Sequence, residues 1–221
     1  MSGVVALESL LQARRLWKGP GSEPLAGAQP TGHPALDATL PSGGWPEAAL
    51  SEILLPGEGL GELRLLWPSL ARLSRAGERI VLVAPPHRPY PAAWQAAGVV
   101  LGQLVLVEAA SEVEALWAAE QCLRSGSCGA VLCWPRRADD RALRRLCVAA
   151  ETGQTLAFAL RPLQAAANPS PAALRLAFDA GPGCVRVLKC RGGLAPVAPL
   201  ALGATAPGTA APGTTALGAA G

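Results

Sequence analysis

The chain has 221 residues, half of them hydrophobic, and a formal net charge of +3 at pH 7. This length suits one folded domain with extensions, and so small a charge gives no general attraction to nucleic acid. The six cysteines form no Cys-x-x-Cys pair and there are only two histidines, so we expect reduced, mostly buried thiols and no metal site. No stretch reaches the roughly 20 uninterrupted apolar residues of a membrane span, so we expect a cytoplasmic protein without membrane contact.

The first 30 residues are predicted to be a helix and a linker. Residues 4–18 carry apolar side chains at helical spacing, and a Gly/Pro-rich stretch follows as far as Pro30. Such a helix can pack on its own chain or on a partner, and the sequence leaves both open. The contact candidates in this region are Leu10, Arg14, Arg15 and Trp17.

A strand, a glycine-rich turn and a helix are expected over residues 51–73, the layout of a phosphate-binding loop. In such a loop a Lys and a Ser/Thr follow the glycines and contact the phosphates and Mg²⁺. Here Glu62 and Leu63 occupy those two places, and neither of the two lysines, Lys18 and Lys189, follows the turn. We therefore predict a degenerate loop that binds no cofactor, formed by Gly57, Gly59, Gly61, Glu62 and Leu63.

Apolar runs and helical patterns alternate through the centre of the chain. Strands are expected at 51–55, 79–84, 104–107, 130–134 and 156–160, with helices between them. Ser111 and Glu114 form a capping box, and one face of the helix that they start is predicted to carry Val113, Leu116, Ala119 and Leu123. This alternation predicts a mostly parallel α/β sheet covered by helices on both faces. His33 is expected at the surface or at a helix cap.

The pattern changes near residue 173. Two alternating runs, 174–178 and 184–188, predict an antiparallel hairpin at the sheet edge. One face of it is either solvated or a surface for a partner or DNA, with contact candidates Arg175, Arg186, Lys189 and Arg191. From residue 194 the chain is rich in Ala, Pro, Gly and Thr and is predicted to be disordered to residue 221.

The order of motifs resembles the RecA-like recombinase ATPases. Thr31-Gly32, Leu36-Asp37, Gly43-Gly44 and Pro46 lead into the first strand in the same order. More narrowly, residues 5–193 resemble the ImuA family, a RecA-like group associated with translesion DNA synthesis. The segments that carry this resemblance are Gly43–Pro46, Gly61–Leu66, Ala84–Pro86, Ala115–Gln121, Asp140–Leu146 and Val187–Lys189 with Arg191–Gly193.

The resemblance implies a degenerate RecA-like domain over residues 31–193 and no enzymatic activity. The acids that such ATPases carry after the second and fourth strands are replaced here by Ala84-Pro85 and Trp134-Pro135. It further implies a non-catalytic adaptor in SOS-induced mutagenic DNA repair, nucleoid-associated when active. The implied partners are an ImuB-like protein, RecA and an error-prone C-family DNA polymerase, with DNA contacted indirectly.

Two alternatives remain open. The first is an SOS cell-division inhibitor resembling SulA, itself a degenerate RecA-like protein. The second is a RecA-modulating protein, a residual NTPase or a direct DNA binder. It would use the basic cluster Arg136, Arg137, Arg141, Arg144 and Arg145, which is more simply explained as a solvated helix face.

Overall fold

The computed structural model describes residues 29–59, 61–179, 183–196 and 198–202. Its central element is an eight-stranded sheet in the order β3-β2-β4-β5-β1-β6-β7-β8. The strands are β1 Leu50–Leu55, β2 Ile80–Val83, β3 Leu104–Val107, β4 Ala130–Cys133, β5 Leu156–Pro162, β6 Leu174–Phe178, β7 Cys184–Cys190 and β8 Leu200–Ala201. The α-helices are α2 Pro34–Asp37, α3 Leu63–Arg75, α4 Pro91–Ala96, α5 Glu112–Arg124 and α6 Asp140–Gly153. The short 3₁₀ segments η1 Leu101–Gln103 and η2 Leu163–Ala167 precede β3 and follow β5.

The sheet is mostly parallel, as predicted. Strand β1 lies in its interior and pairs in parallel with both β5 and β6. Strand β7 pairs antiparallel with β6 and with β8, which gives the predicted hairpin at this end of the sheet. The mixed α/β class and the C-terminal hairpin are therefore confirmed.

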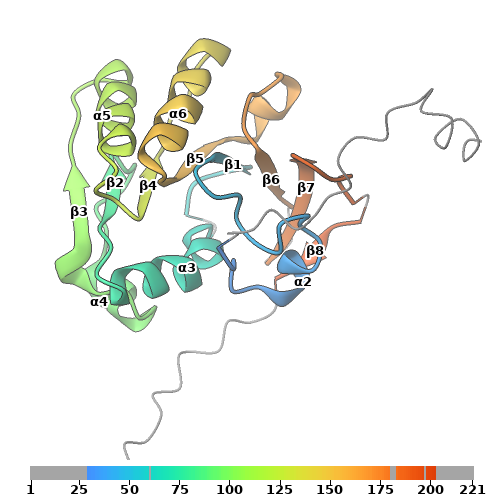
Figure 1. The fold of residues 1–221 in the computed structure, drawn as a ribbon, viewed down its shortest axis with the longest axis horizontal. Coiled ribbons are helices and arrows are strands. Elements are labelled where there is room, and N and C mark those ends of the chain that lie inside the picture. Colours follow the sequence, from blue (N-terminus) through green and yellow to red (C-terminus); the bar gives the residue numbers. More distant parts are fainter. Residues whose placement is uncertain (1–28, 60, 180–182, 197, 203–221) are drawn as a thin grey trace, which may run out of the picture.

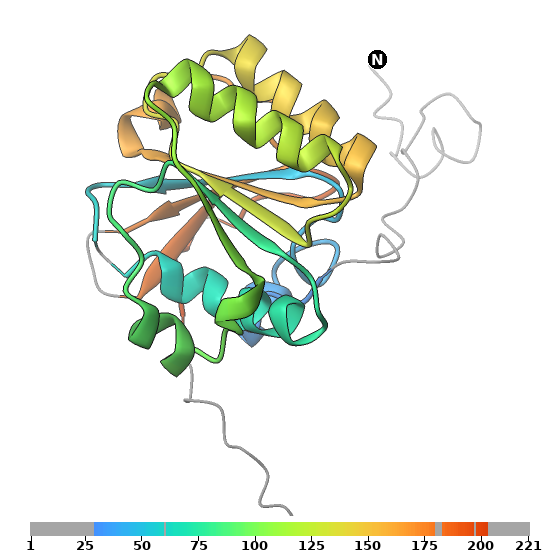
Figure 2. The same cartoon turned by 90° about the vertical axis from the view of Figure 1, so that its left-hand side faces the viewer.

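Helices cover both faces of the sheet (Figures 1 and 2). Helices α5 and α6 lie side by side on one face, and α3 and α4 lie on the other. Each face has its own apolar core: Leu123, Leu143 and Leu146 belong to the first, Leu66 and Leu70 to the second. The near-continuous apolar strands β2 and β4 are buried throughout, because they lie between these two layers.

Two helix starts are fixed by side-chain caps. The amide of Glu114 donates to Ser111 Oγ at 3.2 Å, and Glu114 Oε2 accepts from the Ala110 amide at 2.9 Å. The amide of Ala142 donates to Asp139 Oδ1 at 2.7 Å at the start of α6. The first pair of contacts confirms the predicted capping box, and Asp139 supplies the corresponding cap for α6.

Two local predictions were wrong, and a third needs a correction of its burial only. Val113 is 78% exposed, although Ala119 and Leu123, which were predicted to lie on the same face of α5, are buried. His33 is the N-cap residue of α2, as expected, but it is buried, and its Nε2 donates to the Leu65 carbonyl of α3 at 3.2 Å. Residues 200–201 form strand β8, so the predicted disorder does not hold there. Residues 203–221 lie outside the described part.

Candidate functional site: the glycine loop and the strand ends beside it

The glycine loop connects β1 to α3, as the sequence predicts. Gly59 and Gly61 have φ values of 73° and 82°, a conformation that costs a glycine little and other residues more. Glu62 occupies the N-cap position of α3, and its side chain makes no capping hydrogen bond. The backbone frame of a strand–turn–helix loop is therefore present.

The side chains of this loop do not suit a phosphate. Glu62 is 8% exposed, and its Oε2 has no hydrogen-bond partner among the described residues. Leu63 packs against the apolar core. A buried carboxylate where an ammonium is needed would repel a nucleotide phosphate. The side chains of the loop therefore offer no favourable contact to a phosphate.

A second carboxylate lies at the tip of the loop. Glu58 forms an ion pair with Arg136, which follows β4, and lies 3.5 Å from His87 Nε2 after β2. The two strands whose ends were expected to lack acids thus bring basic side chains to the loop. All three side chains are exposed to solvent, so each contact contributes at most about 1 kcal/mol to stability.

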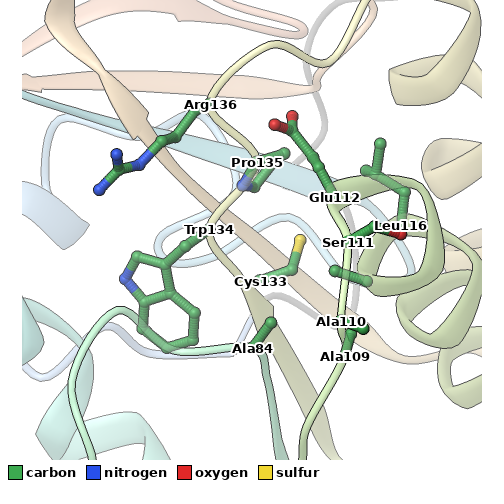
Figure 3. A pocket seen from close by; sticks show the side chains of 11 residues that line it. Ala84, Ala109, Ala110, Ser111, Glu112, Leu116, Cys133, Trp134, Pro135 and Arg136 are labelled. Atoms are coloured by element: carbon green, nitrogen blue, oxygen red, sulfur yellow. The ribbon is translucent and has the colours of Figure 1, made fainter.

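A pocket of about 260 Å³ lies beside the loop, at the carboxyl ends of β2, β3 and β4. Figure 3 shows Cys133 between Trp134 and Arg136 on one side and Ser111, Glu112 and Leu116 on the other. Burial raises the pKa of the Cys133 thiol to about 12, although the nearby Arg161 guanidinium opposes this shift. The thiol is therefore protonated and unreactive at neutral pH.

The other polar groups of this pocket are used within the chain. Ser111 caps α5, and Glu112 Oε1 accepts from the Arg137 amide at 2.7 Å. Among the described residues no three His, Cys, Asp or Glu side chains gather as a possible metal site. The pocket thus presents neither a poised nucleophile nor a metal-ligand set.

The four contact candidates predicted on the hairpin do not share one surface in the structure. Arg186 is exposed and pairs with Asp179 at 3.2 Å, while Lys189 Nζ donates to the Ser170 carbonyl at 2.7 Å. Arg191 is exposed, but Arg175 is 7% exposed and faces the interior. The expectation that Arg175 shares a surface with the other three is wrong, because a buried acid holds it inside.

That acid is Glu52, in the middle of β1. It is fully buried and lies between two buried arginines, with Arg161 Nη1 of β5 at 2.5 Å from Oε1 and Arg175 Nε of β6 at 2.6 Å from Oε2. The second contact is an ion pair without hydrogen-bond geometry. The guanidinium groups also donate to main-chain carbonyls of Ala138, Ala165 and Asn168. The sequence predictions missed this Arg–Glu–Arg triad. Charged residues inside otherwise apolar strands, such as Glu52 and Arg161, could have indicated it.

The basic cluster at the start of α6 is mostly neutralised. Arg144 pairs with Asp140 at 2.6 Å, Arg145 pairs with Glu120 of α5, and Arg136 pairs with Glu58. Acceptors within the chain therefore satisfy three of the five arginines proposed for DNA. The candidates Leu10, Arg14, Arg15 and Trp17 lie outside the described residues.

Two large apolar side chains are exposed on α5. Val113 is 78% exposed, and Trp117, one helical turn later, is 59% exposed. Residues four apart project from the same side of a helix, so they form one apolar stripe on the outer layer. Large exposed aromatic side chains are typical of protein-binding surfaces.

None of the described helices is long and apolar enough to cross a bilayer.

The fold and this site define a mixed α/β domain with a phosphate-loop frame that lacks the loop's cationic and hydroxyl side chains. Comparison with family models matches residues 50–157, slightly less than half of the chain, to the cell division inhibitor SulA. Among solved structures, SulA from Pseudomonas aeruginosa is similar, with 29% identity and a TM-score of 0.45. That similarity covers 53% of this chain and 99% of the other. Comparison with curated proteins gives no match.

The family match supports a relation to SulA over the segment from β1 to the start of β5. It includes the glycine loop, the pocket in Figure 3 and the apolar stripe of α5. It gives no support to the narrower resemblance to ImuA. Residues 158–202, with most of β5 and all of β6 to β8, lie beyond the match.

Proposed function

We propose that this chain is a non-catalytic, RecA-like protein-binding domain of the bacterial DNA-damage response, acting as a cell-division inhibitor of the SulA type. The observation that carries this proposal is the family match over residues 50–157. The substitution of Glu62 and Leu63 for the phosphate-loop Lys and hydroxyl residue agrees with a binding role, because a protein-binding domain needs no nucleotide chemistry. The target would be a tubulin-like division GTPase.

The contact surface in this proposal is the stripe of Val113 and Trp117 on α5. Both lie within the matched segment and are exposed, so their replacement changes a surface rather than the core. Truncation of an aromatic anchor typically costs a protein interface about 2 kcal/mol or more, a factor of about 30 in affinity. The double variant Val113→Glu/Trp117→Glu should bind the target at least that much more weakly.

Expression without DNA damage tests the proposal. Cells that produce the wild-type chain should grow into filaments, and the double variant at equal protein level should not cause filamentation. Val148→Glu makes the same kind of change at an exposed valine of α6 and serves as the matched control. Normal division in cells that produce folded wild-type chain would exclude a division inhibitor.

A second candidate is an adaptor of the ImuA type in mutagenic translesion synthesis. It is favoured by one observation: the sheet continues through β6, β7 and β8 beyond the segment similar to SulA, and the earlier resemblance extends to residue 193. An affinity-tagged chain recovered from DNA-damaged cells would then retain an ImuB-like protein, RecA or an error-prone polymerase. Their absence, together with filamentation on expression, would favour division inhibition over the adaptor.

A further inference from the structure

A second cavity, of about 290 Å³, lies at the opposite end of the strands from the glycine loop. It opens where β1 and β6 begin and β7 ends, between the segment after α2 and the C-terminus of α6. Its walls are mainly apolar and include Leu40, Pro46, Ala48, Ala173, Leu174 and Cys190. Cavities for cofactors and drug-sized ligands usually measure about 300–1,000 Å³, so this one suits a smaller molecule, of the size of a single amino acid.

The backbone around this cavity is strained. Ala48 and Gln154, which both line it, have φ values of 48° and 50°, a left-handed conformation that disfavours residues with a Cβ. Among the described residues one other non-glycine residue has a positive φ, namely Ala84, which lines the pocket in Figure 3. Such strain costs about 1–3 kcal/mol per residue and gathers where a ligand is held. The strain therefore marks this cavity as a binding site.

The rim of the cavity carries one anion and one cation. Glu47 and Arg191 both line it, and both are exposed. Glu47 Oε1 accepts from Gln29 Nε2 at 3.1 Å, which leaves Oε2 without a partner among the described residues. The Arg191 guanidinium forms no hydrogen bond or ion pair with any described residue. Both charged groups are therefore available to a ligand.

Helix α6 adds a weaker negative potential on one side of the cavity. The helix ends at Gly153, its C-cap Gln154 lines the cavity, and the C-terminus of a helix carries a partial negative charge. Together with Glu47 this end favours an ammonium group, whereas Arg191 favours a carboxylate. A ligand with a single charge would be attracted by one side and repelled by the other, but a zwitterion is complementary to both.

We propose that this cavity binds a free α-amino acid with a bulky apolar side chain, such as leucine. The apolar side chain lies among Pro46, Leu174 and Cys190, the carboxylate pairs with Arg191, and the ammonium group pairs with Glu47 beside the C-terminus of α6. This inference goes beyond the proposed function and does not depend on it.

The binding is reversible and involves no covalent step. Cys190 is the one cysteine in the cavity wall; it is 9% exposed, and burial raises the pKa of its thiol. A protonated thiol is a poor nucleophile, so Cys190 serves as part of the apolar wall.

Calorimetric titration of the full-length chain with L-leucine tests the proposal. One molecule per chain should bind, with a Kd of about 1 mM or below. Three probes each lack one feature: N-acetyl-L-leucine has no ammonium group, L-leucinamide has no carboxylate, and L-alanine has almost no apolar side chain. Each should bind at least about tenfold more weakly, because the matching protein group loses its partner or the cavity stays partly unfilled.

Two variants assign the charges. Arg191→Gln should weaken leucine binding at least about tenfold but should not weaken the binding of L-leucinamide, which has no carboxylate to lose. Glu47→Gln should weaken leucine binding similarly and should not weaken that of N-acetyl-L-leucine. Arg186→Gln and Glu108→Gln change exposed charges that do not line the cavity, so they are the matched controls and should bind leucine like the wild type.

Cys190 gives a second readout in the same chain. Its alkylation by iodoacetamide, followed by peptide mass spectrometry, should be at least about threefold slower with leucine at about ten times its Kd. Cys184, at the other end of β7, should react at the same rate with and without leucine. Absence of both binding heat and protection would refute the proposal. Equal affinities for leucine, leucinamide and N-acetylleucine would also refute it, because the two charges would then play no part.

Discussion

The buried triad of Glu52, Arg161 and Arg175 allows a prediction of which residue contributes most to stability, because each replacement leaves a different buried net charge. The three side chains are 0–8% exposed and together carry one net positive charge. Replacing Glu52 with Leu leaves two buried guanidinium groups without a counter-ion. Replacing Arg175 with Met leaves one neutral pair, Glu52 with Arg161. The acid should therefore be worth more to stability than either arginine.

The expected magnitudes follow from the contacts. Breaking a buried ion pair from one side costs about 3–5 kcal/mol, and Glu52→Leu breaks two pairs at once, so a loss of at least about 5 kcal/mol is expected. Arg175→Met removes one pair and two hydrogen bonds, to the Asn168 and Ala165 carbonyls, but it relieves the excess charge. We expect it to cost about 1–3 kcal/mol. Domains of this size have only about 5–15 kcal/mol of stability, so Glu52→Leu should be close to unfolded.

Urea unfolding of the full-length variants, followed by Trp fluorescence, measures these differences. The triple variant Glu52→Leu/Arg161→Met/Arg175→Met should recover much of the stability lost in Glu52→Leu, because no buried charge is left unpaired. A Glu52→Leu protein as stable as Arg175→Met would refute the reasoning. So would a triple variant no more stable than Glu52→Leu alone.

Three shorter predictions concern other parts of the fold. Gly153→Ala should lower the free energy of unfolding by more than about 2 kcal/mol, because the added Cβ would lie 1.8 Å from the Leu123 carbonyl oxygen. Gly102→Ala is the control, since a Cβ at Gly102 meets open space and should change stability little. Thermal unfolding of the two variants measures the difference. Ser111→Ala should cost about 1 kcal/mol in the same assay through the lost cap of α5. The Cys133 thiol has an ordinary pKa of 9.0 when unfolded and about 12 when folded, so stability should fall as pH rises above 9. Between about pH 8.5 and 10.5 the wild type should lose about 2 kcal/mol more than Cys133→Ala, and equal slopes in urea unfolding would contradict this.

Most of the fold was predictable because it depends on local patterns. Apolar runs such as 80–83 and 130–133 alternate with capped helices, and this periodicity alone indicates a buried parallel sheet. The loop substitutions at Glu62 and Leu63 were equally local. Each of these features can be read within about ten residues of sequence.

The features that were missed depend on distant residues. Glu52 and Arg161 are 109 positions apart, and only the pairing of β1 with β5 brings them together. Arg175 was therefore assigned to the surface by its alternating strand pattern, which gives the face of a side chain but not what covers that face. Val113 was misplaced because α5 has apolar residues on more than one side, and packing against α6 selected the buried one.

The triad also bears on the extent of the domain. The segment similar to SulA ends at residue 157, yet Glu52 within it depends on Arg161 and Arg175 beyond it. Strand β1 also pairs with β6 along Ser51–Leu54 and with β5 mainly from Phe158 onward, so removing residues 158–202 would expose both edges of the strand that feeds the glycine loop. An exposed strand edge with a buried, unpaired carboxylate is unstable on both counts. Residues 50–157 therefore do not form a separable unit in this chain, and a division-inhibiting surface on α5 would act as part of the whole eight-stranded domain.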